Sequence, residues 1–480
     1  MPELSDLGPQ LSKLLVELDK RTARCKRNSL YLDATNECAI PDAIVSARMT
    51  KAYKLLMPMA GAPWASVAVD SVLDRLEVGG IRTGDKDTDR AIWRSVWQAN
   101  ALDSESKLGH QGILTNGRAF AIIWPDAEGQ PEVVLQGADQ VIVQYQEGRH
   151  QPRHRIAALR RWVDDGDRQH VTLYTSTALY KLSEAKEQTD KDGRVKAGGK
   201  WWEPREETGY DGLPEPWPLE NPFGVVPVVE LATNRRLGAG AFPYARGEYE
   251  HCIGLLDRID LLTFLGLVVA LWMGFPLRGV VGDKIIRDDD NNPLPPFSSK
   301  PDEIIQFEKP DAKLVEFQAA DRGNLSIFGE LAQFAYVTKS PAHYFPMDRG
   351  GIANINADTI RALEGGLHAK VDGIHKPFIG EGWEEITRVG GLMLPDSIEV
   401  PREAAVYWID RQTRSLAEAA DASIKLKDIL PPLFIAEKFL NLTQEEIGRI
   451  DAEGAGAAFN RLLEEAANTP TPELVPEPVA

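Results

Sequence analysis

Three side chains that could bind a metal ion lie close together in one segment of the sequence. His368, Asp372 and His375 stand at positions i, i+4 and i+7, so a continuous helix would place all three on one face with the spacing of metal ligands. A regular helix is disfavoured there, because Gly373 lies within the segment and a Lys-Pro pair directly follows His375. No fourth ligand suggests itself, and we favour an ordinary helix surface without a metal ion.

Short motifs for other kinds of chemistry are incomplete. The stretch "DDDNNP", Asp288 to Pro293, resembles the start of a calcium-binding loop, but proline stands where that loop needs glycine and the later glutamate is missing. "GAGAFP", from Gly238, lacks the third glycine of a dinucleotide fingerprint, and "AGGKW" lacks the first glycine and the hydroxyl residue of a phosphate loop. No serine lies in a nucleophile elbow, and the eight histidines are scattered. We therefore expect no enzymatic activity, no cofactor and no metal site.

The charge balance limits the function further. The chain has 72 acidic and 54 basic residues, a formal net charge of -18, which argues against a surface that holds nucleic acid by neutralising its phosphates. A protein past which DNA slides is compatible with this balance. One basic stretch, "RHQPRHRIAALRR", could contact phosphate, although on alternating strands such residues more often form a solvated face. Its arginines are Arg149, Arg153, Arg155, Arg160 and Arg161.

Length and cysteine content indicate a large globular protein made in a reducing compartment. The 480 residues, of which 43% are hydrophobic, are enough for two to four domains with sizeable cores. The three cysteines, Cys25, Cys38 and Cys252, are odd in number and far apart, which predicts buried thiols instead of disulfides or metal ligands. The first twenty residues lack the continuous apolar core of a signal peptide, so we expect synthesis in the cytosol.

An uncharged run of seventeen residues, 261–277, raises the question of a membrane span. As a helix it would be about 26 Å long, short of the roughly 30 Å hydrocarbon core of a bilayer. Asp257, Arg258 and Asp260 precede it, Pro276 interrupts its far end, and no second comparable segment exists. The sequence therefore predicts a helix buried by protein on all sides, either in a large core or between neighbouring subunits.

Periodicity predicts helices at the start of the chain and strands after them. Apolar residues recur at helical spacing in 7–18, in 69–76, where Gly79-Gly80 ends the pattern, and in 93–97. Six alternating runs then predict an antiparallel meander: 118–124, 131–136, 140–145, 155–163, 170–175 and 178–182.

The segment after the meander is irregular in composition. Residues 186–224 are rich in glycine, proline and charge, which predicts a long surface excursion, and 225–231 reads as a returning strand. A long helix is predicted over 244–273, amphipathic at first and uncharged in its second half. After Pro276, short strand-like runs around the acidic turn "RDDDNNPLPPF" predict a small inserted β unit.

The remainder is predicted to be mainly helical. A helix resumes near Leu325, and "SPAHYFPMDRGGIANIN" forms an irregular loop. Apolar spacing over 360–378 predicts a helix that glycines and Pro377 should kink. Helices follow at 416–426 and 432–439, and the capping box of Thr443 with Glu446 opens another.

This order of elements resembles that of portal proteins, the head-to-tail connectors of tailed double-stranded DNA bacteriophages. The resemblance spans most of the chain and rests on five stretches: "NPFGVVPVVELATNRR" (221–236), "GEYEHCIGLLDRIDLL" (247–262), "FPLRGVVG" (275–282), "NINADTIRALEGGL" (354–367) and "TQEEIGRI" (443–450). In one branch of the family the fourth stretch reads Asn-x-Ser-Gly before a helix. Here Asn354 matches, whereas Asn356 and Ala357 replace the serine and the glycine.

The resemblance implies an α+β, portal-like fold that is mostly helical and assembles into a ring of about twelve subunits. A wing region with helices and a β meander would be followed by a stem, a clip and a crown. The implied regions are the N-terminal wing 1–243, the first stem helix 244–273, the β-containing clip 274–322, the second stem helix 323–339, the tunnel loop 340–356, the long kinked helix and wing return 357–411, the C-terminal crown helices 412–468 and a disordered tail 469–480.

By the same resemblance, the ring would be assembled in the host cytoplasm and would occupy one capsid vertex of the virion. It would form the channel for DNA packaging and ejection, and subunit contact in the ring would bury the uncharged helix. The implied partners are other copies of the chain, the packaging terminase, neck and adaptor proteins, the major capsid protein and double-stranded DNA passing without sequence specificity. No membrane partner is implied.

Three sets of residues would carry these roles. The tunnel loop would contain His343, Tyr344, Phe345, Arg349, Gly350, Gly351 and Asn354. The stem interface between subunits would contain Leu262, Leu265, Val269 and Trp272. Docking of partners to the clip would involve Arg287, Asp288, Asp289 and Asp290. The alternatives are another phage structural protein without a DNA channel, such as a minor head protein, a metal-dependent hydrolase, and membrane attachment.

Overall fold

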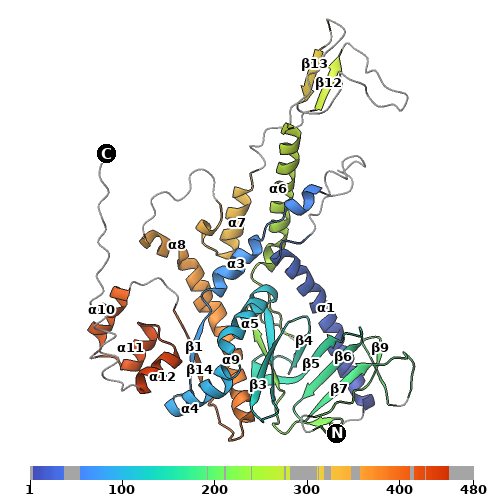
Figure 1. Ribbon diagram of the computed structural model, residues 1–480, viewed down its shortest axis with the longest axis vertical. Helices are drawn as coiled ribbons and strands as arrows, with labels where there is room; N and C mark the ends of the chain where they lie inside the picture. Colours follow the sequence, from blue (N-terminus) through green and yellow to red (C-terminus); the bar gives the residue numbers. More distant parts are fainter. Residues whose placement is uncertain are drawn as a thin grey trace. The chain divides into compact units, whose positions relative to one another are not determined.

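Helices and antiparallel sheets are combined in the computed structural model, as expected for an α+β protein (Figure 1). The structure describes residues 4–36, 55–191, 193–209, 212–238, 240–274, 277–281, 311, 313–317, 326–346, 357–410, 416–427 and 429–452. The chain forms two compact units. The first unit comprises Met1–Ser29, Val67–His251 and Ile355–Ala480, and the second comprises Leu30–Ser66 and Cys252–Asn354.

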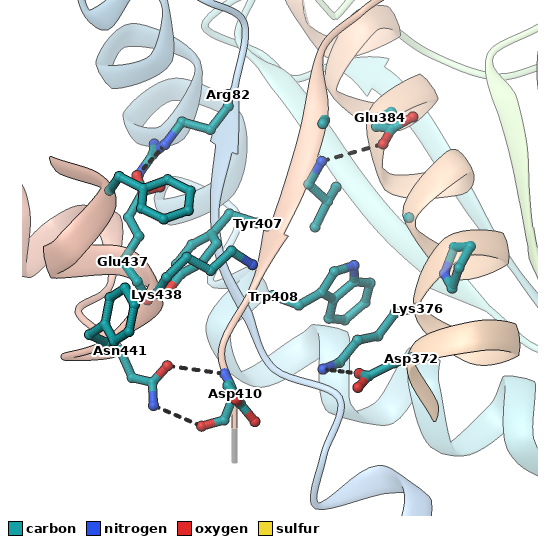
Figure 2. Close-up of a pocket in the computed structure, with 16 residues that line it drawn as sticks. Arg82, Asp372, Lys376, Glu384, Tyr407, Trp408, Asp410, Glu437, Lys438 and Asn441 are labelled. Atoms are coloured by element: carbon teal, nitrogen blue, oxygen red, sulfur yellow. Dashed lines mark hydrogen bonds and ion pairs between the residues drawn. The ribbon is translucent and has the colours of Figure 1, made fainter. Parts of the chain in front are cut away.

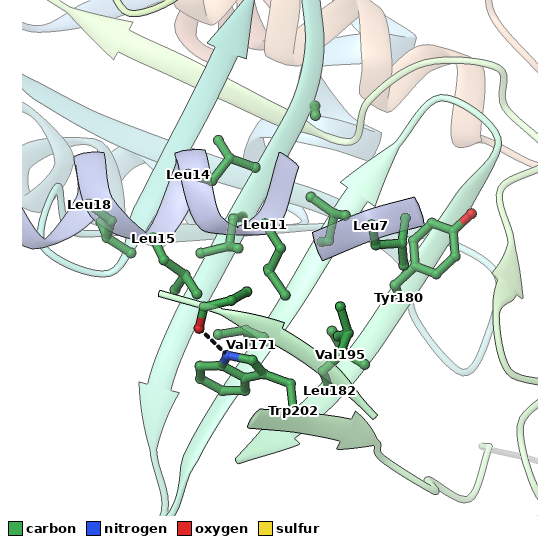
Figure 3. Close-up of a cluster of buried hydrophobic side chains, with 14 of the residues drawn as sticks. Leu7, Leu11, Leu14, Leu15, Leu18, Val171, Tyr180, Leu182, Val195 and Trp202 are labelled. Carbon is green, nitrogen blue, oxygen red and sulfur yellow. Dashed lines mark hydrogen bonds between the residues drawn. The ribbon is translucent and has the colours of Figure 1, made fainter. Parts of the chain in front are cut away.

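The N-terminal helix α1 (Gly8–Leu32) covers one face of the largest sheet. Leucines recur every three or four residues from Leu7, in the 3-10 turn Leu4–Leu7 before α1, to Leu18, and all five are buried, which confirms the predicted helix (Figure 3). They pack on Val171, Tyr180 and Leu182 of the sheet. The strand order is β4-β5-β6-β7-β9-β8, with β10 also paired to β7. The bounds are β4 (Val141–Tyr145), β5 (Arg155–Val163), β6 (Gln169–Thr175), β7 (Ala178–Glu184), β8 (Val195–Ala197), β9 (Lys200–Pro204) and β10 (Leu219–Glu220).

The prediction of a surface excursion over 186–224 is wrong in part, because this segment adds three strands to the sheet. β9 pairs with β7, β8 pairs with β9, and β10 pairs with β7. Trp202 on β9 is 1% exposed, and its indole N–H donates to the Ala197 carbonyl at 3.0 Å. The surrounding glycines and charged residues occupy the turns, so the average composition of the segment concealed a short apolar pattern that completes the core beneath α1.

A second, three-stranded sheet has the order β11-β2-β3 and forms from β2 (Arg118–Pro125), β3 (Pro131–Gln136) and β11 (Val228–Ala232). Together with β4 to β7, these strands confirm the predicted strands and the returning strand, but the single meander is wrong, because β2 and β3 belong to a different sheet from β4 to β7. The helices α5 (Leu102–Asn116) and α9 (Lys376–Met393) pack on this sheet. Arg118 on β2 and Glu230 on β11 form a buried ion pair of 2.7 Å, which compensates the desolvation of both charges.

A two-stranded sheet joins distant parts of the chain and was not predicted. Its strands are β1 (Val78–Arg82) and β14 (Ala405–Trp408), which pair antiparallel. The helix α3 (Trp64–Leu73) ends well before Gly79-Gly80, so these glycines belong to a strand instead of a helix stop. A Cβ atom at Gly79 would lie 2.7 Å from the Tyr407 ring, so the absence of a side chain permits this close approach. The helix α4 (Lys86–Ile92) and a π-helical turn (Trp93–Gln98) follow β1.

The predicted kinked helix is present over 357–393. It consists of α8 (Ala357–Lys370), a π-helical turn (Val371–His375) and α9, and the π-helical turn lies directly before Pro377, as the softened pattern predicted. The C-terminal helices are α10 (Leu416–Leu426), α11 (Pro432–Lys438) and α12 (Gln444–Ala452). The capping box before α12 is confirmed, because Thr443 N–H donates to the Glu446 carboxylate at 2.7 Å and Glu446 N–H donates to the Thr443 hydroxyl at 3.3 Å.

In the second unit, the long helix α6 (Ile253–Gly274) follows a 3-10 turn (Glu250–Cys252). The predicted start at Tyr244 is wrong, because residues 244–249 are held in extended connections: Arg236 and Tyr244 form a β-bridge, and Glu248 N–H donates to the Leu114 carbonyl at 2.6 Å. The strands β12 (Leu277–Val281) and β13 (Lys313–Phe317) form an antiparallel pair, which confirms a β insert. The runs "EIIQFE" and "RDDDNNPLPPF" lie outside the described residues.

The second unit also contains α7 (Phe328–Thr338) and a 3-10 turn (Ala342–Tyr344). Arg258 on α6 forms an ion pair of 2.6 Å with Glu330 on α7, so a charged contact links the two helices. None of the helices in the described part of the chain is both long and apolar enough to cross a bilayer.

Candidate functional site

The helix α6 carries apolar side chains on more than one face, as its sequence predicted. One face is packed within the second unit: Phe264 and Val268 are buried against Ala60. Leu56, Met57 and Leu261 are partly buried against the same cluster. This contact covers only part of the helix surface, so the remaining apolar side chains of α6 need another partner or remain in water.

The other apolar face contains the residues proposed for subunit contact. Leu265 is 36% exposed, and further along the helix Met273 is 59% exposed. Leu262 and Val269 are partly buried, and the side chain of Trp272 lies outside the described part of the structure. Leu265 and Met273 are thus large apolar side chains of α6 that remain exposed in the single chain.

Exposed apolar residues occur elsewhere in the second unit too. Tyr336 and Val337 on α7 are 85% and 47% exposed, and Val281 and Val315 on the β12–β13 hairpin are also exposed. A single exposed leucine or valine is ordinary on a protein surface. In the described part of the second unit, exposed apolar side chains thus occur on α6, on α7 and on the β12–β13 pair.

The charged residues around the start of α6 are satisfied inside the second unit. Asp260 is 5% exposed and accepts a hydrogen bond of 2.8 Å from the Asn36 amide, and burial raises the pKa of its carboxyl. Asp257 accepts a hydrogen bond of 2.6 Å from the Tyr31 hydroxyl. The acidic residues that precede the uncharged run therefore fix the helix within its own unit.

The candidate metal ligands on the kinked helix do not converge. His368 lies 3.6 Å from Glu364, whereas Asp372 forms an exposed ion pair of 2.7 Å with Lys376. The π-helical turn Val371–His375 rotates His375 away from the position that a regular helix would give it relative to His368. His375 is also fully buried. In the described part of the chain, no group of three or more His, Cys, Asp or Glu residues could hold a metal ion.

His375 instead belongs to a buried polar network that the sequence did not reveal. Its Nδ1 lies 2.7 Å from the Thr233 hydroxyl, and its Nε2 lies 3.1 Å from the Glu248 carboxylate. Lys370 donates to the same carboxylate. Burial by itself would raise the pKa of Glu248, but the His375 hydrogen bond and the Lys370 charge outweigh it and lower the pKa to about 2. The network ties the π-helical turn to the segment that leads into α6.

A Ser–His–Asp arrangement occurs on the large sheet but is not accessible to a substrate. His170 Nδ1 lies 2.8 Å from the Ser183 hydroxyl, and His170 Nε2 lies 2.9 Å from the Asp164 carboxylate. Ser183 is 2% exposed and stands directly opposite His170 in the register of β6 and β7. Because an attacking hydroxyl must reach its substrate, this group serves as a cross-strand contact between the two strands.

A cavity of about 860 Å³ opens between β14, α9 and α11 (Figure 2). Its carboxylates already have partners: Asp372 accepts from Lys376, Glu437 from Arg82, and Glu384 from the Val406 N–H. The lining contains no serine, threonine, cysteine or histidine. The lining therefore contains neither a serine–histidine nor a cysteine–histidine pair.

The cysteines and the basic stretch 149–161 were also considered as candidate sites. Cys25 and Cys252 are buried free thiols, as predicted, and burial raises the pKa of Cys25 to about 11; Cys38 lies outside the described residues. Of the basic stretch, Arg155 is buried and pairs with Glu385 at 2.6 Å. Arg161 donates to Asp19 on α1 at 2.5 Å. Arg155 and Arg161 therefore contribute to packing between elements, whereas Arg149 and Arg153 are exposed.

Comparison with known proteins decides the family. A family model described as "Phage portal protein, SPP1 Gp6-like" matches residues 14–294 of the chain. The chain belongs to the phage portal protein family. A portal protein of Mycobacterium phage L5 is 27% identical over 503 residues, which cover 100% of this chain and 96% of the relative. A portal protein of Mycobacterium phage D29 is 27% identical over 446 residues, which cover 88% of this chain and 83% of the relative.

These matches confirm the resemblance noted in the sequence. The protein is a portal protein, the head-to-tail connector of a bacteriophage and a component of the virion that takes part in genome packaging. Portal proteins form a structural family, which agrees with the incomplete catalytic motifs in the sequence.

The start of the portal's expected tunnel loop is held by aromatic packing. Phe345 is 5% exposed, and its ring lies 6.1 Å from that of Trp64 and 5.8 Å from that of Phe334. His343 and Tyr344 stack edge to face at 4.6 Å and are partly exposed. Phe345 therefore anchors the segment to α3 and α7. The other expected loop residues, Arg349, Gly350, Gly351 and Asn354, lie outside the described residues, as do the clip residues Arg287, Asp288, Asp289 and Asp290.

Proposed function

We propose that this portal protein forms a closed ring of about twelve copies at one capsid vertex and that double-stranded DNA passes through its channel in packaging and ejection. The observation that carries the proposal is the outward apolar face of α6, on which Leu265 and Met273 are exposed in the isolated chain. A helix that is packed on one face within its own unit and apolar on the other suits a subunit interface. In a closed ring every copy would cover that face of its neighbour.

The regions of the chain would then have distinct roles. The stem would consist of 253–273 and 323–339, the clip of 274–322, the tunnel loop of 340–356, and the crown of 412–468. We propose that the clip, through Arg287 and the three aspartates that follow it, docks the packaging terminase and later the neck and adaptor proteins. The wing would face the major capsid protein, and assembly would take place in the host cytoplasm.

The negative net charge of the chain is compatible with a channel through which DNA moves. Duplex DNA carries one negative charge per roughly 1.7 Å, so a uniformly basic channel would hold the duplex by counterion release. A formal net charge of -18 disfavours strong binding of DNA phosphates over most of the surface. DNA could then move through the ring without sequence-specific binding.

Val269→Asp tests the ring. Val269 lies on the outward apolar face of α6, and burying an unpaired carboxylate there would cost several kcal/mol, about 3 or more, at every interface of the ring. We expect the purified variant to remain a folded monomer by circular dichroism and to give no rings in negative-stain images or native mass spectra. Val16→Asp is the matched control, because Val16 is 48% exposed on α1, outside the stem, and this variant should form normal rings.

Normal rings from the Val269→Asp variant would show that this face of α6 is not at a subunit interface. Wild-type protein that stays monomeric at all concentrations would overturn the ring itself.

A further inference from the structure

A cationic cleft of about 330 Å³ lies on the first unit between α4, its following π-helical turn and α12. Five cationic and two carboxylate side chains line it, in a chain whose formal net charge is -18. The cations are Arg82, Lys86, Arg90, Arg94 and Arg449, and the carboxylates are Asp89 and Glu445. Such a local reversal of sign is the electrostatic pattern of a site for anions.

The cations are arranged in a row. Lys86 and Arg90 on α4 and Arg94 at the start of the π-helical turn recur every four residues, and all three line the cleft. All three are exposed. Arg449 on α12, whose side chain is 72% exposed, adds a cation from the opposite side of the cleft and is paired with Glu445.

The carboxylate nearest the row is occupied by other contacts. Asp89 accepts hydrogen bonds of 2.6 Å from the Thr83 N–H and 2.7 Å from the Thr83 hydroxyl, which fix it against the end of β1. Arg82 pairs mainly with Glu437. Asp89 and Arg82 thus hold the cleft together, and Lys86 and Arg94 are the exposed cations of the row that present charge to a ligand.

We propose that this cleft binds the phosphate backbone of duplex DNA. The inference rests on the proposed function, which brings DNA to the ring. A row of guanidinium and ammonium groups matches the repeated, sequence-independent charge of a nucleic-acid backbone, and guanidinium binds phosphate in a bidentate way. A single strand is disfavoured, because Trp93 in the lining is only 4% exposed and stacks on Trp97 at 5.0 Å, which leaves no open aromatic face for bases.

The contact should be weak and sensitive to salt, since few phosphates are neutralised. The cleft would let an otherwise acidic subunit bind DNA weakly at one place. A channel that is basic throughout would bind DNA strongly and slow its movement. No base is read, so the cleft should bind duplexes of any sequence equally.

The test measures binding of a labelled duplex of about 20 base pairs to purified rings, by fluorescence anisotropy over a series of salt concentrations. We expect Lys86→Glu with Arg94→Glu to lower the affinity at low salt by about tenfold or more, and to reduce the slope of log affinity against log salt by about 2. The matched control is Lys107→Glu with Lys186→Glu, two exposed lysines outside the cleft, which changes the net charge equally. This control should keep most of the binding.

Equal binding by the cleft variant and wild type, or an equal loss in the control, would overturn the proposal. If the charge reversal prevents ring formation, Lys86→Gln with Arg94→Gln should still reduce the salt slope by about 2. Tighter binding of a polyglutamate peptide than of the duplex at the same salt would assign the cleft to an acidic protein segment and refute the DNA proposal. Rings that assemble but do not bind the duplex would refute the cleft alone and leave the ring proposal intact.

Discussion

Replacing Glu248 with glutamine should destabilise the first unit because it removes the carboxylate that pairs with Lys370 and His375 in the buried network described above. Glu248 is 4% exposed and contacts both Lys370 and His375. Glutamine keeps nearly the same volume but removes the negative charge that Glu248 places beside the Lys370 ammonium, which is 6% exposed. Breaking a buried ion pair by removing one partner is one of the few single changes that cost several kcal/mol.

The size of the effect follows from the pKa of the carboxyl. The network lowers the pKa of Glu248 from 4.5 to about 2, and at roughly 1.4 kcal/mol per pKa unit this difference corresponds to about 3 kcal/mol of stability. Because the pKa of the folded state is the lower one, this stability is fully present above pH 4.5 and is lost as the pH falls from 4.5 towards 2. The Glu248→Gln variant should lack that acid-dependent loss.

The free energy of unfolding should be measured by urea denaturation at neutral pH and at a fixed protein concentration, since assembly contributes to apparent stability. Asp372→Asn is the matched control: it also removes a carboxylate that pairs with a lysine at the same π-helical turn, but its side chain is 54% exposed, so the cost should stay below about 1 kcal/mol. A loss below about 1 kcal/mol for Glu248→Gln, or equal losses in both variants, would refute the assigned role of the network.

Two further predictions concern stability. Burial lowers the pKa of His110 from 6.5 to about 4, so the unfolding free energy should fall by up to about 3 kcal/mol as the pH drops from 6.5 to 4, and a His110→Gln variant should lose this part of the pH dependence; identical pH profiles would contradict it. Trp202→Ala should cost about 3 to 5 kcal/mol in urea titrations, whereas Trp201→Ala, its partly exposed neighbour, should cost about 1 kcal/mol or less; similar costs would show that Trp202 is not a core residue.

Much of the fold could be predicted because its signals are local. The leucine spacing of α1, the alternating strands from β2 to β7, the uncharged helix α6 and the capping box at Thr443 all depend on residues a few positions apart, whose relation the backbone geometry of a helix or strand fixes. The five stretches that resembled portal proteins were sufficient for the family, which the comparisons confirmed. The sequence alone was therefore sufficient to assign the chain to its family.

Other features were decided only by tertiary contacts between distant residues. The strand pairing of β1 with β14 joins Val78 to Trp408, and the double glycine that enables it reads locally as a helix stop. The core position of Trp202 depends on α1, nearly two hundred residues earlier, and was hidden by the charged turns around it.

The buried network around Glu248 and the cationic cleft also depend on contacts between residues far apart in the sequence. Glu248 and His375 are paired because residues 244–249 are held by hydrogen bonds to α5, so that the predicted helix start is displaced. The cationic row from Lys86 to Arg94 is visible as a spacing, but only the folded chain brings Arg449 to the other side of it. Local sequence determines which face of an element is apolar or charged; which faces meet depends on the packing of the whole chain, since burial and charge pairing are settled between elements and not within them.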